Sequence, residues 1–274
     1  MKNATKYLSQ NCPANPWFVD RLIISAFLDI NGLEVVNNKF LLSYLIRKED
    51  EDFEILSGFI EIIKNTKDEF HIEDLIELFE YVISPSDRII NGAIYTPSVI
   101  REYIVEQAFG RENVEFNTAK IADIACGCSG FLLTAAKELK RSTGNNYQYI
   151  FQNQIYGLDI QEYSVTRSKI LLSLLALIEG EDIEDFHFNI HQGDTLIFKW
   201  EEHYDDFNGF EIIVGNPPYV CARNLEDTVK ENLKNWSVCN SGNPDLYIPF
   251  FQIGYEYLSE NGFLGFITMV DGCQ

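Results

Sequence analysis

The sequence predicts an α/β protein in which a doubly wound parallel sheet follows a small all-helical domain. Between about residues 17 and 83 the apolar side chains recur every three or four positions, which is the spacing of one face of a helix. Beyond residue 120, short apolar runs end at glycine or acidic residues and alternate with helical stretches, which is typical of strand–helix–strand units. We therefore expect a helical domain over 1–88 and a sheet domain over 89–274.

The helical domain is expected to contain about four helices. Polar or glycine-containing breaks at 31–32, 49–52 and 64–70 separate the apolar stretches from one another. No cluster of chemically active side chains stands out between the breaks, so we expect the chemistry to lie in the sheet domain.

The composition indicates a globular protein with a sizeable core, since 46% of the residues are hydrophobic and 14% are aromatic. No apolar run approaches the roughly 20 residues that a membrane span needs, and the N-terminus begins with polar sequence. We therefore expect a soluble, cytoplasmic protein with no membrane partner.

The charge of the chain disfavours direct contact with nucleic acid. It carries 42 Asp and Glu against 21 Lys and Arg, a formal charge of −21, and the basic residues do not cluster. Such a field repels a phosphate backbone. Any surface that grips DNA is therefore expected outside this chain.

A strand, a glycine loop and a helix follow one another over residues 120–140. The apolar run that contains Asp123 passes through Gly127 and Gly130, which allow close backbone approach, into a helix whose first N–H groups can bind a ligand. The spacing of these glycines excludes the dinucleotide-binding fingerprint, which needs three glycines in the pattern Gly-x-Gly-x-x-Gly.

Two further strands are expected to end in an acid. Asp159 closes the run 154–160, and Asp194 follows the alternating run 186–191. In a doubly wound sheet, ligands bind beyond the carboxyl ends of the strands, so both carboxylates can reach a nucleoside. A helix cap is the alternative role for Asp159.

A fourth strand, 212–215, ends at the corner Asn216-Pro217-Pro218-Tyr219. Two prolines fix φ and remove two ladder donors, so the strand must end there and the corner is rigid. Asn216 offers a carbonyl and an amide, Pro217 a backbone carbonyl, and Tyr219 a flat ring face. Together they suit a planar amine.

Residues 95–109 combine Tyr95-Thr96-Pro97 with a helical run that begins at Ser98. We expect Thr96 to cap this helix, with Pro97 at its first position. Residues 220–243, next to the Tyr219 corner, are polar and long, and we expect a mobile loop there.

Metal binding is not expected. The pair Cys126 and Cys128 has no matching Cys or His pair nearby, and His187 and His191 have no evident acidic partner. All six cysteines are expected to be free thiols.

These motifs together resemble those of the N6-adenine DNA methyltransferases of the restriction-modification type, which share the Asn-Pro-Pro-Tyr corner. The resemblance spans about residues 91–268 and implies a class I S-adenosylmethionine-dependent methyltransferase fold, Rossmann-like, with strand order 3-2-1-4-5. It implies S-adenosyl-L-methionine as cofactor and DNA as substrate. It also implies a role for each of the following residues: for catalysis Asn216, Pro217, Pro218 and Tyr219; for the cofactor Tyr95, Thr96, Pro97, Asp123, Ala125, Cys126, Gly127, Gly130, Phe131, Asp159, Ile160, Asp194, Thr195 and Asn216.

The family continues with further strands and a target-recognition region, so we expect this sequence to be incomplete at its C-terminus, with DNA bound through that region. A specificity or restriction subunit is a further expected partner. Two alternatives stay open: a protein glutamine methyltransferase, which also has an Asn-Pro-Pro-Tyr corner, and a non-catalytic cofactor-binding assembly subunit.

Overall fold

The computed structural model describes residues 2–12, 15–82, 95–242 and 244–268. They form two compact units, here called the helical unit (residues 1–83 with 166–186) and the sheet unit (84–165 with 187–274). The predicted domain boundary near residue 88 lies outside the described residues. The division at that point stays a prediction, and the inclusion of 166–186 in the helical unit was not expected.

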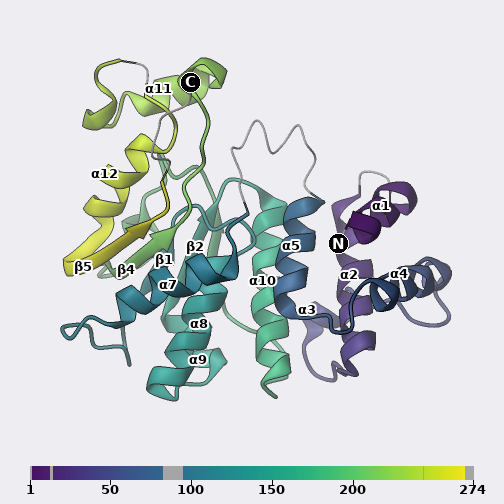
Figure 1. The fold of residues 1–274 in the computed structure, drawn as a ribbon. Helices are drawn as coiled ribbons and strands as arrows, with labels where there is room; N and C mark the ends of the chain where they lie inside the picture. The colour runs from purple at the N-terminus through teal and green to yellow at the C-terminus, as the bar shows by residue number, and fades with distance from the viewer. Residues whose placement is uncertain (1, 13–14, 83–94, 243, 269–274) are drawn as a thin grey trace. The chain divides into compact units, whose positions relative to one another are not determined.

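The helical unit is built from helices, of which α1 to α5 are drawn in purple and blue in Figure 1 and α10 in teal. The four helices expected between residues 17 and 83 are α2 to α5, whereas α1 was not predicted. Asn15 caps α2, since its side chain accepts from the N–H of Phe18, and Gly32 ends that helix at φ 60°. The helices are α1 (Lys2–Asn11), α2 (Pro16–Asn31), α3 (Lys39–Leu42), α4 (Phe53–Thr66), α5 (Ile72–Tyr81) and most of α10 (Glu162–Ile178).

Polar contacts, those of Arg167 buried and those of Asp182 more exposed, fasten residues 166–186 to the rest of the helical unit. Arg167 Nε lies 2.9 Å from Asp20 Oδ1, with both side chains only 3% exposed, and Arg167 Nη1 donates to the carbonyl of Phe79. The Asp182 carboxylate accepts from the three successive N–H groups of residues 36–38. A buried cation is tolerated only when it is paired and hydrogen-bonded, so these contacts specify the arrangement within the unit.

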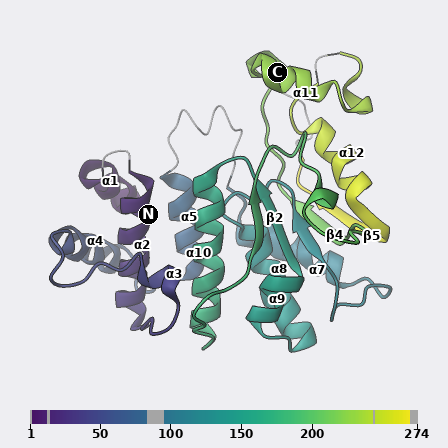
Figure 2. The ribbon, with the colours of Figure 1, turned by 180° about the vertical axis from the view of Figure 1, so that it is seen from behind.

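The sheet unit contains five parallel strands in the order β3-β2-β1-β4-β5 (Figure 2), which confirms the predicted strand order. The strands are β1 (Ile121–Asp123), β2 (Ile155–Asp159), β3 (Asn189–Gln192), β4 (Phe210–Gly215) and β5 (Leu258–Phe266). β1, β2 and β4 lie close to the predicted runs, and β3 begins about three residues later than the predicted run at 186.

Helices cover both faces of this sheet. On one face lie α7 (Ser98–Phe109), α8 (Gly130–Thr143) and α9 (Tyr147–Asn153). On the other lies α12 (Ile248–Tyr257). Two glycine contacts show that α7 and α12 lie on opposite faces. Gly265 of β5 lies against Ile104 of α7, and Gly254 of α12 lies against Leu264 of β5. Successive residues of a strand point to opposite faces of the sheet.

The segment 220–243, expected to be a loop, contains short helices: η2 (Ala222–Asn224), α11 (Asp227–Leu233) and η3 (Ser237–Cys239). Leu225 and Leu233 are buried in the core on the α12 face, and Val229 and Trp236 pack against it. These four residues recur at intervals of four, four and three, which is a helical period. The prediction of a polar loop is therefore wrong for this segment, and its mobility stays a prediction.

Four cysteines, Cys12, Cys126, Cys128 and Cys239, are buried free thiols. Cys221 is disulfide-bonded, which corrects the prediction that all six are free. None of the helices in the described ranges is both long and apolar enough to cross a bilayer.

Candidate active site at the carboxyl edge of the sheet

Because all five strands are parallel, the residues that follow them meet at one edge of the sheet. Asp123 and Asp159 end β1 and β2, Asp194 follows β3, and Asn216 follows β4. The strand pairing thus gathers at one edge predicted residues that are spread over about a hundred positions of sequence.

The glycine loop contains a turn in which two residues have a positive φ. Gly127 has φ 51° and Ser129, the residue before α8, has φ 63°. The N–H of Cys126 donates to the carbonyl of Leu158 on β2, which fixes the loop against the sheet. Gly130 opens α8, so the helix N-terminus with its unpaired N–H groups lies at this edge.

Three loop residues of the predicted cofactor site differ in exposure. Cys126 and Phe131 are 5% and 4% exposed and serve the packing of the loop, whereas Ala125 is partly exposed. Cys126 lies under Gly157 of β2, where an added Cβ would come within 3.2 Å of the thiol sulfur. These side chains shape the loop rather than project from it.

Asp123 lies beneath the site. Its carboxyl is 2% exposed and Oδ1 accepts from the N–H of Ala125 at 3.1 Å. A Cβ on Gly215 would lie 2.6 Å from that oxygen, so glycine is required where β4 passes the carboxyl. Burial, which disfavours the charged form, raises the pKa of Asp123 to about 8.

Asp159 joins the loop to the start of α10. Its Oδ1 accepts from the N–H of Gln161 and its Oδ2 from the N–H of Gly127, both at 2.9 Å. Burial raises its pKa, although these donors and Ser164 act in the opposite direction. Because α10 begins at Glu162, the bond to Gln161 lies in the turn before the helix, and the same carboxylate also holds the glycine loop. Ile160, the next residue, is 53% exposed at this edge.

Asp194 is contacted by a residue that sequence reasoning missed. Its Oδ1 accepts from the N–H of Leu196 at 2.9 Å, and its Oδ2 accepts from Asn232 Nδ2 of α11 at 3.1 Å. Thr195 is buried and its hydroxyl donates to the carbonyl of Ile124 at 2.5 Å, tying the β3 turn to β1. The helical period of residues 225–236 was the signal that could have placed Asn232 over the sheet edge.

The corner after β4 is held from two sides. Asn216 Nδ2 donates to Thr96 Oγ1 at 3.0 Å, and the Tyr219 hydroxyl donates to the carbonyl of Ile267, just past β5, at 2.8 Å. Burial, with Tyr247 nearby, raises the pKa of Tyr219 to about 12, so the phenol stays protonated. The rings of Tyr219 and Tyr247 have centroids 5.7 Å apart and are tilted by 51°. Pro217 is buried and Pro218 partly so.

Thr96 does not cap α7 as we predicted. The helix begins at Ser98, Pro97 occupies the cap position, and no side chain makes a cap hydrogen bond. The Thr96 hydroxyl bonds Asn216 instead. Tyr95 is partly buried and Pro97 is exposed.

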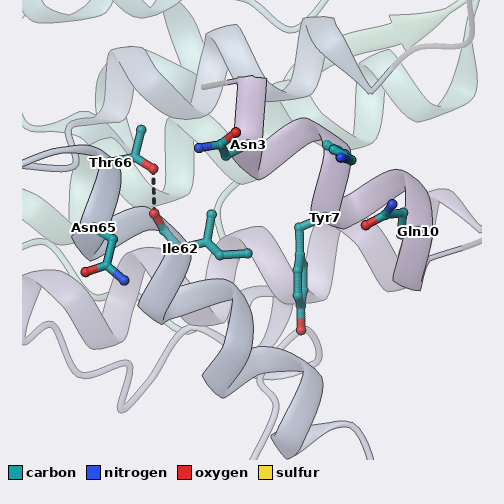
Figure 3. Close-up of a pocket in the computed structure, with 7 residues that line it drawn as sticks. Asn3, Tyr7, Gln10, Ile62, Asn65 and Thr66 are labelled. Carbon is teal, nitrogen blue, oxygen red and sulfur yellow. Dashed lines mark hydrogen bonds between the residues drawn. The ribbon is translucent and has the colours of Figure 1, made fainter.

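Two other features of the described residues include none of the predicted site residues. The ring of His191 bonds the Tyr204 hydroxyl at 2.6 Å, and the described chain holds no group of three His, Cys, Asp or Glu placed for a metal. A pocket of about 320 Å³ lies in the helical unit between α1 and α4 (Figure 3). It contains none of the predicted site residues; it is lined by Asn3, Lys6, Tyr7, Gln10, Ile62, Asn65 and Thr66.

The parallel five-stranded sheet covered by helices is that of the class I S-adenosylmethionine-dependent methyltransferase fold. A Listeria monocytogenes protein described as such a methyltransferase superposes with a TM-score of 0.53 at 14% identity, covering 98% of this chain and 75% of that one. The type IIL restriction-modification enzyme MmeI, solved in complex with DNA, superposes with a TM-score of 0.60 at 14% identity, covering 96% of this chain and 49% of that one.

Sequence comparison is more specific. Residues 153–271 match the family described as Eco57I restriction-modification methylase. The type II restriction enzyme and methyltransferase RM.Eco57I of Escherichia coli is 27% identical over 244 residues, which is 70% of this chain but only 24% of that protein. The chain is therefore related to restriction-modification DNA methyltransferases, as its motifs predicted, and it spans about a quarter of the length of that relative.

Proposed function

We propose that this chain carries the cofactor-binding and catalytic part of an enzyme that transfers a methyl group from S-adenosyl-L-methionine to the N6 amine of adenine in DNA. The observation that carries the proposal is the position of the Asn216 corner, at the same sheet edge as the glycine loop and the acids of β2 and β3. A donor of methyl groups and an acceptor amine would meet there.

The residues at this edge fit the cofactor. Asp159 and Asp194 each end or follow a strand, and both residues are partly buried. Asp159 would accept from the ribose hydroxyls and Asp194 from the adenine amine of the cofactor, as charge-assisted hydrogen bonds. Ile160 offers an exposed apolar surface to the adenine ring. The turn at Gly127 and the start of α8 would receive the methionine part, with Tyr95 and Pro97 beside it.

The substrate base would be held by the Asn216 corner. An adenine turned out of the duplex presents an amine with two N–H donors, and the Asn216 side-chain carbonyl and the Pro217 backbone carbonyl supply two acceptors. The base would stack on Tyr219, whose ring is fixed by its hydrogen bond to Ile267. Stacking on an aromatic ring contributes about 1–3 kcal/mol per base.

The protein would contribute mainly by positioning the substrate amine against the methyl group. The cofactor supplies an already activated methyl group on a sulfonium centre. The two carbonyls would accept hydrogen bonds from the amine protons, which returns lone-pair density to the nitrogen. They would hold that nitrogen in line with the sulfur–methyl bond, which breaks as the nitrogen–methyl bond forms, and the methylated amine would then release one proton to water. Orientation of this kind accounts for a large share of many enzymatic accelerations, and it needs no covalent nucleophile.

The net negative charge of the chain limits how it could bind DNA. With a formal charge of −21 it would approach duplex DNA only through a basic surface supplied elsewhere in the complete enzyme or by a specificity or restriction subunit. The substrate is therefore proposed as DNA engaged through such a partner surface, and the cellular compartment as the cytoplasm.

A methyl-transfer assay tests the proposal. The full protein is incubated with methyl-labelled S-adenosylmethionine and duplex DNA, and the digested nucleosides are separated. Label in N6-methyl-2′-deoxyadenosine supports the proposal, and label in a methylated deoxycytidine would assign a different base. Label in a glutamine side chain of an added protein, with none in DNA, would favour the glutamine methyltransferase alternative. Cofactor binding without transfer to either would favour an assembly subunit.

A further inference from the structure

The hydrogen bond between Thr96 and Asn216 joins two residues that lie 120 positions apart. Thr96 is 9% exposed and lies in the short stretch before α7, while Asn216 follows β4. In this bond the Asn216 Nδ2 atom is the donor and the Thr96 hydroxyl oxygen the acceptor, at 3.0 Å. In this bond Nδ2 faces Thr96, so Oδ1, on the other side of the planar amide, points away from Thr96.

A second contact fixes Thr96 itself. Arg101 is 1% exposed, and its Nη1 donates to the backbone carbonyl of Thr96 at 2.7 Å. The same guanidinium lies against Gly130, the first residue of α8, where an added Cβ would come within 2.9 Å of Nη1. A planar guanidinium with several fixed donors suits such a junction, because its charge and geometry do not vary near neutral pH. Arg101 thus holds the Thr96 segment against the end of the glycine loop.

We propose that Thr96 is a positioning residue for the Asn216 amide, turning its carbonyl toward the substrate amine, and that Arg101 holds Thr96 in place. The inference rests on the proposed function of Asn216. An amide turned the other way would present Nδ2 to the amine, so that a donor would face a donor. Thr96 therefore holds the amide in the orientation that leaves its carbonyl to the substrate amine.

The test compares Thr96→Val, which keeps the shape and removes the acceptor, with Thr96→Ser, which keeps the hydroxyl. We expect Thr96→Val to lower kcat about 5- to 10-fold, the equivalent of losing one hydrogen bond, with little change in cofactor affinity, and Thr96→Ser to restore most of the rate. Thr143→Val is the matched control: its hydroxyl bonds the Leu139 carbonyl in the last turn of α8, and its loss should leave kcat unchanged.

Asn216→Ala, measured alongside, separates the two hypotheses. If it keeps normal turnover, the proposed role of Asn216 fails together with this inference. If it loses turnover while Thr96→Val keeps the wild-type kcat, only the positioning role fails. A Thr96→Val protein that loses cofactor affinity at unchanged kcat would also overturn the inference, because Thr96 would then serve the cofactor alone.

Discussion

Replacing Asp123 by Asn should make the sheet unit less sensitive to pH. The Asp123 carboxyl is 2% exposed, and burial raises its pKa to about 8 from the ordinary value of 3.8. Between these two values the folded chain keeps a proton that the unfolded chain releases, so stability falls as pH rises through this window. The slope is at most about 1.4 kcal/mol per pH unit, and from pH 5 to pH 7 the loss is about 3 kcal/mol.

Asparagine has the same shape and keeps the acceptor for the Ala125 N–H. Asp123→Asn should therefore match the wild type near pH 4 and exceed its stability by a few kcal/mol at pH 7. Urea unfolding, followed by the fluorescence of Trp200 in the core of the sheet unit, measures the difference at each pH. Asp159, whose pKa burial also raises, is present in both proteins and largely cancels in the comparison. A stability difference that does not change between pH 5 and pH 7 would refute the assignment of a buried, protonated carboxyl at Asp123.

Three further predictions follow from the same geometry. S-adenosylmethionine carries a positive charge, so its binding at pH 7 should release a proton from Asp123; the calorimetric enthalpy should then depend on the buffer, and Asp123→Asn should remove that dependence. Asp194→Ala should weaken cofactor binding about 10- to 100-fold, the equivalent of about 1.5–3 kcal/mol, and unchanged affinity would remove this carboxylate from the site. Leu233→Ala, which empties a buried position of α11, should cost about 2–5 kcal/mol in urea unfolding, and a cost below about 1 kcal/mol would show that this segment lies outside the core.

The strand ends of the site were predictable because each carries a local signal. Asp159 and Asn216 follow apolar runs that stop abruptly, and a parallel sheet brings such ends to one edge whatever the intervening sequence. The glycine loop was predictable for the same reason, since Gly127 marks a turn that few other residues adopt.

The contacts between distant segments were not predictable. Nothing in the local sequence distinguishes a Thr96 that caps a helix from one that bonds Asn216, since both roles use the same hydroxyl. The bond from Asn232 to Asp194 depends on how α11 folds back over the sheet edge. The pairing of Arg167 with Asp20, which joins residues 147 positions apart, has no periodic signature at all.

The measurement that tests the central claim most directly is single-turnover methylation of duplex DNA by the full protein with Asn216 replaced by alanine, beside its affinity for S-adenosylmethionine. The substitution removes one of two acceptors for the amine and leaves Asp159 and Asp194 untouched. We predict a rate at least about 100-fold lower, with cofactor affinity within about 2-fold of the wild type, because a preorganised hydrogen-bonding group acts chiefly on the transition state. A near-normal rate of adenine methylation would contradict the account, since another residue would then hold the amine.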